Sequence, residues 1–146
     1  MDRLPISALR DDWIRILEEI TPRSDSSSTA LVISIGPQWG SVTAGTTADA
    51  ISDEHYFETR DYYPFTQEFD LSHDRLFDAA NGDVQLLSQS GDPIPIDDGD
   101  DAFNEPIISV FREWALEFLG EREHHLTWLW LGDHDRSFWK PTRLIG

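Results

Sequence analysis

Two stretches of the chain repeat apolar residues at the three- and four-residue spacing of an amphipathic helix. The first covers residues 7–20, and the second covers residues 105–119 and is closed by Gly120. Asn104 is the expected N-cap of the second helix, which places Pro106 in its first turn. The apolar stripe of this second helix consists of Ile107, Ile108, Phe111, Trp114, Ala115, Phe118 and Leu119. The pattern therefore predicts two main helices, each with one face turned toward a core.

Other stretches are typical of strands. Residues 29–35 and 126–131 are apolar on both faces, which favours central strands that are covered on both sides. A Gly-Pro turn after the first of these runs leads into residues 39–44, so a hairpin is expected there. Weaker strand patterns occupy residues 56–69, 84–87 and 138–145.

A short helix is expected over residues 72–80, with Ser72 as its cap. Leu76 and Phe77 are its expected inward-facing residues, and Asn81-Gly82 supplies the stop. Helices and strands do not alternate regularly along the chain, and two strands look hairpin-linked. The order predicts a single α+β domain over residues 1–146, with a mostly antiparallel or mixed sheet packed by the two main helices and the short one.

The composition narrows the class of protein. The chain has 146 residues, the usual length of one domain, and no cysteine, which excludes disulfides and thiolate metal sites. Its apolar runs are too short to span a bilayer, and its first residues do not follow the signal-peptide pattern, so a cytoplasmic protein is expected. Acids number 28 against 11 bases, giving a net charge of -17. Such a charge repels nucleic acids and anionic membranes and attracts basic partners.

The acidic residues are concentrated in one part of the chain. Residues 76–111 hold eight acids and no Arg or Lys. The densest group consists of Asp97, Asp98, Asp100, Asp101 and Glu105. A solvated loop, a surface for a basic protein and a cation site are the three interpretations. The register of an EF-hand fails, because taking Gly99 as its sixth position puts Ile94 where the first carboxylate ligand belongs.

No catalytic constellation is recognisable. The chain has no GxSxG or HExxH motif, and its Gly-Pro-Gln-Trp-Gly stretch lacks the Lys-Ser/Thr end of a phosphate loop. Polar residues flank the strand 126–131, namely His124, His125, Asp133, His134 and Asp135. These residues form two groups at opposite ends of the strand, so they are not expected to bind one metal ion together. We expect no catalytic residue, no cofactor and no metal.

The aromatic stretch offers an anchor for a partner. Tyr62 and Tyr63 lie beside Pro64, and tyrosine is favoured at protein interfaces because it combines apolar area with a polar tip. With the acids above, they are the expected partner-binding residues. The pattern favours a non-enzymatic acidic protein that neutralises a basic protein, namely a bacterial immunity protein that inhibits a nuclease-type toxin domain. The alternatives are a DNA-mimic inhibitor of a nucleic-acid-binding defence protein and a small enzyme with an unrecognised site.

Overall fold

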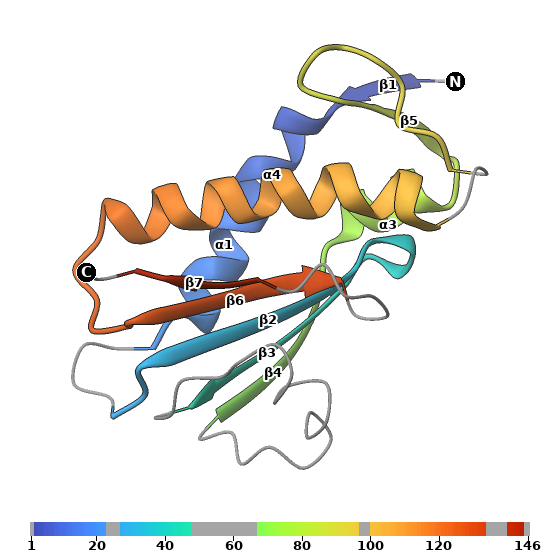
Figure 1. Cartoon of the computed structure of the whole chain (residues 1–146). Helices are drawn as coiled ribbons and strands as arrows, with labels where there is room; N and C mark the ends of the chain where they lie inside the picture. The colour runs from blue at the N-terminus through green and yellow to red at the C-terminus, as the bar shows by residue number, and fades with distance from the viewer. Residues whose placement is uncertain (1, 23–26, 48–66, 97–99, 134–139, 145–146) are drawn as a thin grey trace.

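The computed structural model of this chain describes residues 2–22, 27–47, 67–96, 100–133 and 140–144. The strands are β1 Asp2–Pro5, β2 Ala30–Gly36, β3 Ser41–Thr47, β4 Gln67–Ser72, β5 Val84–Leu87, β6 Trp128–Asp133 and β7 Lys140–Arg143. The helices are α1 Arg10–Ile20, α3 Asp74–Ala80 and α4 Asp100–Gly120, with 3₁₀ turns η1 Ile6–Leu9 and η2 Pro37–Trp39. Figure 1 shows α4 lying across one face of the main sheet, with α1 beside it.

The main sheet has five strands in the order β4-β3-β2-β6-β7. The expected hairpin is present, since β2 and β3 pair antiparallel across η2. β2 and β6 pair in parallel, whereas the two outer pairings are antiparallel. Every residue of β2 is buried, as expected for a central strand with two apolar faces. The predicted α+β class with a mixed sheet is therefore confirmed.

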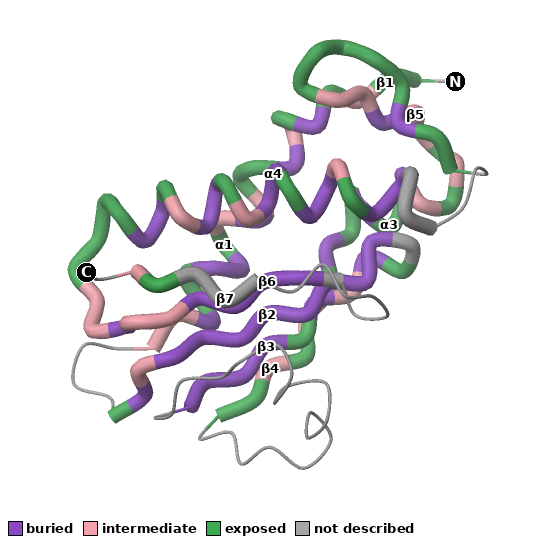
Figure 2. The backbone as a smooth tube through the Cα atoms, viewed as in Figure 1, coloured by how far each residue is buried: buried purple, intermediate pink, exposed green. Residues whose placement is uncertain are grey.

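The core lies between the sheet and its two long helices. Leu31, Ile33 and Ile35 project from β2 into the same apolar cluster as the stripes of α1 and α4, and Figure 2 shows this inner layer as buried. Trp13 of α1 stacks on Phe111 of α4 with 4.6 Å between ring centroids. The Trp13 indole Nε1–H also donates to the Phe111 carbonyl at 3.0 Å. The helix stripes predicted from the sequence are thus the faces that pack.

Two exposed ion pairs link α1 to the C-terminal part of α4 and to the turn after it. Arg10 Nη2 lies 3.2 Å from Glu117 Oε2, and Arg122 Nη2 lies 2.9 Å from Glu18 Oε1. Exposed pairs of this kind contribute only about 0–1 kcal/mol each. Burial of the apolar faces therefore provides most of the attraction between the two helices.

Helix α4 begins earlier than the sequence predicts. It starts at Asp100, so Asn104 is a fully buried residue inside the helix rather than its cap, and Pro106 lies beyond the first turn. Phe103 belongs to the core cluster, and its burial draws the turn before the proline into the helix. The proline removes one backbone hydrogen bond there, which tertiary packing outweighs.

The smaller elements also differ in detail. Ser72 is the last residue of β4, and His73 caps α3 in its place. Leu76 is buried as expected, but Phe77 is exposed. The β5 strand pairs in parallel with β1 at the start of the chain, a strand that the sequence pattern does not predict. None of the helices in the described ranges is long and apolar enough to cross a membrane.

Candidate interaction surface

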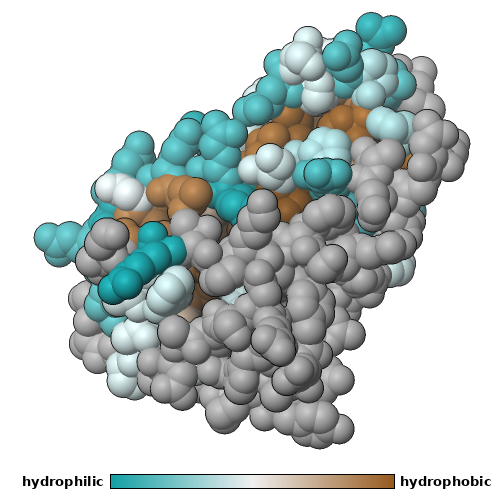
Figure 3. Space-filling model, in the orientation of Figure 1, coloured by the Kyte–Doolittle hydropathy of each residue, from teal (hydrophilic) through white to brown (hydrophobic). Residues whose placement is uncertain are grey.

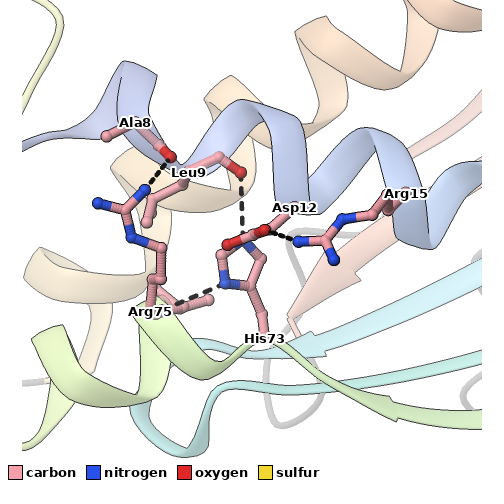
Figure 4. A network of polar contacts seen from close by, with 7 residues as sticks. Ala8, Leu9, Asp12, Arg15, His73 and Arg75 are labelled. Carbon is pink, nitrogen blue, oxygen red and sulfur yellow. Dashed lines mark hydrogen bonds and ion pairs between the residues drawn. The ribbon is translucent and has the colours of Figure 1, made fainter.

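His73 fixes the turn between β4 and α3. Its side chain is buried, and its Nδ1 accepts a hydrogen bond from the Leu76 N–H at 3.2 Å, which caps α3. Nε2 lies 3.1 Å from the Leu9 carbonyl oxygen and therefore donates its proton to it, as Figure 4 shows. Burial lowers the pKa of His73 below its ordinary value of 6.5. The ring is thus held neutral, with both nitrogens engaged in ties to α3 and η1.

Arg75 is an exposed residue of α3 that also reaches η1. The Arg75 guanidinium donates from Nη1 to the Ala8 carbonyl oxygen of η1 at 2.8 Å. On α1, the guanidinium of Arg15 pairs with the Asp12 carboxylate in the same view. The arginines of this region are therefore directed at groups of the chain itself.

The acids of α3 and of the turn after it are exposed and form no ion pair within the described ranges. Asp74, Asp78 and Asp83 are all exposed, and within the described ranges none of the three takes part in an ion pair. Asp74 and Asp78 are four residues apart, so they share one face of the helix. This surface presents three carboxylates to solvent beside one cation, the exposed Arg75, which bonds to a backbone carbonyl and forms no ion pair with them.

Three large apolar side chains are strongly exposed among the described residues, and they belong to this same region. Their exposed fractions are 54% for Trp39, 46% for Phe77 and 38% for Ile96. Trp39 belongs to η2, which packs against α3, the helix that carries Phe77. The side chain of Ile96 lies next to Gly82, just after α3, where an added Cβ would be 3.9 Å from Ile96 Cδ1. We call the three side chains the apolar triad.

A glycine lets η2 and α3 approach this closely. Gly40 has a φ of 59°, and a Cβ added to it would lie 2.7 Å from Phe77 Cβ and 2.8 Å from the His73 carbonyl oxygen. The His73 backbone N–H in turn donates to the Gly40 carbonyl at 2.7 Å. The turn that carries Trp39 therefore packs closely against the first turn of α3 and is hydrogen-bonded to its cap residue.

The predicted partner-binding residues are only partly described by the structure. Glu105 is exposed on α4, and Asp100 and Asp101 belong to the first turn of that helix. Their side chains lie outside the described part of the structure, as do residues 97–98 and 62–63 as a whole, namely Asp97, Asp98, Tyr62 and Tyr63. Of the predicted contacts, Glu105 is the one whose side chain the structure describes, and it is exposed. Ile96 of the apolar triad directly precedes the predicted acidic loop in the sequence.

Trp39 and Phe77 are not among the partner-binding residues that the sequence predicts. The pattern predicts Trp39 at the start of the returning strand and Phe77 facing inward, whereas both side chains are exposed. One signal was present: Trp39 stands in the Gly-Pro-Gln-Trp-Gly turn, where a side chain at the tip of a hairpin has few neighbours to cover it.

The histidines beside β6 form no metal centre within the described ranges, where no three metal-ligating side chains come together. The His124 Nδ1 accepts a hydrogen bond from the Leu126 N–H at 3.1 Å, which is a local turn contact. His124 and His125 line an open pocket of about 590 Å³ with Arg122 and Leu144. His134 and Asp135 lie outside the described residues.

Two further hollows adjoin the long helices. One of about 260 Å³ lies between α1 and the β4–α3 turn, and its lining includes Asp12, Arg15 and His73. Since both His73 nitrogens are engaged, the imidazole offers no unoccupied base there. The other, of about 350 Å³, lies between α4 and the loop after β5, with Ile6 and Val110 in its lining. Figure 3 shows apolar surface along α4 below the β1–β5 arm.

Comparisons with protein-family models, curated proteins and solved structures find no match for this chain.

Proposed function

We propose that this protein is a non-enzymatic acidic binding protein that neutralises a basic protein partner. The observation that carries the proposal is the group of three exposed carboxylates on α3 and the turn after it, which form no ion pair among the described residues and outnumber the one cation of α3, Arg75. Carboxylates grouped in this way repel one another, and a basic protein surface relieves that repulsion on binding.

The partner that fits this chemistry best is a nuclease-type bacterial toxin domain, which would make this chain an immunity protein. A nuclease must hold phosphates and therefore presents a basic surface. Carboxylates can occupy such a surface in place of phosphates, and the net charge of -17 speeds the encounter by electrostatic steering.

The direct test uses the protein encoded beside the gene for this chain. Its basic domain is purified, and cleavage of DNA or RNA is measured while this protein is added up to an equimolar amount. We expect cleavage to stop at equimolar protein and to return when Asp78→Lys and Glu105→Lys are introduced together. Undiminished cleavage, or a neighbour with no basic domain, would contradict the toxin partner.

A further inference from the structure

We infer that the apolar triad, Trp39, Phe77 and Ile96, is the centre of a docking surface for a basic protein, with the carboxylates of α3 as its rim. This inference rests on the proposed function and names the part of the molecule that performs it. Interfaces commonly have an apolar, aromatic centre surrounded by polar residues that exclude water. Trp39 and Phe77 lie on elements that pack together, Ile96 lies next to Gly82 just after α3, and the exposed acids are on α3 and the turn after it.

The surface is rigid before any partner arrives. The His73 N–H binds the Gly40 carbonyl at 2.7 Å, and the His73 ring caps α3 and reaches η1. Because Gly40 has no Cβ, the turn carrying Trp39 packs directly against Phe77. A pre-organised surface loses little conformational entropy on binding, so more of its contact energy appears as affinity.

The negative charge of the rim favours a basic protein as the partner of this surface. A second copy of this chain would bring Asp74, Asp78 and Asp83 against the same acids, and the repulsion between like charges opposes that contact. Nucleic acid would be repelled for the same reason. An arginine-rich protein surface fits both the apolar triad and its acidic rim. A guanidinium stacks on an indole or phenyl ring, and its N–H groups pair with a neighbouring carboxylate.

An octa-arginine peptide probes this chemistry directly. In a titration of the ¹⁵N-labelled full chain at low salt, we expect the largest NMR shift changes at the Trp39 indole N–H and the Phe77 amide. Phe77→Ser should weaken binding about three- to fivefold, the loss expected for one exposed cation–π contact. Unchanged indole signals from the buried Trp13 and Trp114 would show that the variant is folded.

The matched control is Glu121→Ser, which removes a whole exposed carboxylate just after the last residue of α4, at the opposite end of that helix from α3 (Figure 1). A docking surface at the apolar triad requires the uncharged change Phe77→Ser to weaken binding more than Glu121→Ser does. Attraction to net charge alone gives the opposite order.

Three other results would overturn the docking surface, and they distinguish its failure from that of the proposed function. If the peptide binds but the NMR shift changes lie away from the triad, the protein still binds a basic partner through charge, but its docking surface lies elsewhere. A chain that does not bind the peptide at any low salt concentration contradicts the proposed function as well. Self-association that Phe77→Ser abolishes, measured by sedimentation, would show that a second copy occupies the triad.

Discussion

At the scale of single residues, His73 does the most to set the geometry of the interaction surface. One neutral imidazole accepts from the Leu76 N–H and donates to the Leu9 carbonyl, so it joins α3 to η1 through a buried ring. Protonation would turn Nδ1 into a donor facing the Leu76 N–H, and the cap would be lost. The surface formed by α3 therefore depends on the protonation state of a residue beneath it.

This dependence predicts how stability changes with pH. Burial lowers the pKa of His73, with the nearby Arg75 charge adding to the effect, so the unfolded chain takes up the proton first as pH falls. The contribution of His73 is fully present above pH 6.5 and is lost as pH falls from 6.5 toward the folded pKa. Thermal melts between pH 7.5 and about 5 should show this loss for the native chain.

The matched variant is His73→Asn, because asparagine is also a favoured cap but does not titrate. We expect it to be less stable at neutral pH and to lose less stability on acidification. Subtracting the two melting curves removes the contributions of the other four histidines. Equal pH slopes for the two proteins would show that His73 is not the titrating group.

A second prediction at this scale concerns Gly40. Gly40→Ala adds a Cβ to a residue with positive φ and forces it against backbone atoms of α3, so a loss of about 2–4 kcal/mol is expected. Gly91 also has a positive φ, but no atom lies within 4 Å of an added Cβ. Gly91→Ala should therefore cost only about 1 kcal/mol, from backbone strain alone. Denaturant melts that show equal losses would contradict the close approach of η2 and α3.

At the scale of elements, helix α4 is the main packing unit. Trp114 is 6% exposed, and its ring lies 5.6 Å from that of Phe111. Trp114→Ala should therefore reduce the free energy of unfolding by about 3–5 kcal/mol. The neighbouring Glu113 is exposed, so Glu113→Ala should change it by no more than about 0.5 kcal/mol. An unchanged melting temperature for the tryptophan variant would remove this face of α4 from the core.

Periodicity predicted the two long helices well because their stripes are continuous over several turns. Periodicity could not locate the first residue of α4. Proline is favoured in the first turn of a helix, which predicts a start just before Pro106, whereas the burial of Phe103 extends the helix toward the N-terminus. Periodicity placed Phe77 inward because α3 has only seven residues, of which Leu76 and Ala79 suffice to face the core. The β1–β5 pair joins segments about 80 residues apart, which a local pattern does not reveal.

The candidate surface was predictable only in its charge. Counting acids and bases identified residues 76–111 as an uncompensated segment, and the exposed Asp78, Asp83 and Glu105 belong to it. The aromatic part depends on contacts between η2 and α3, which are more than thirty residues apart and joined through a single hydrogen bond and a glycine. Such a meeting of two distant turns leaves no periodic signal in the sequence.

At the scale of the whole molecule, α3 lies near the start of α4, whereas the ion pairs of Arg10 and Arg122 lie near its end (Figure 1). Exposed acids outside these pairs occur at both ends, for example Asp78 on α3 and Glu121 just after α4. The α3 end differs because exposed Trp39 and Phe77 lie on elements that pack together beside its carboxylates. A basic partner attracted by the net charge of -17 should therefore find its apolar contacts at α3.

The most direct test of this account is the salt dependence of association with the basic domain that the proposed function expects beside this gene, measured by stopped flow. The association rate should fall steeply as salt rises, while dissociation changes much less. Asp78→Lys should slow association at low salt more than Glu121→Lys does, although both change the net charge equally, and the two rates should converge at high salt. An association rate indifferent to salt and to both substitutions would contradict electrostatic capture of a basic partner.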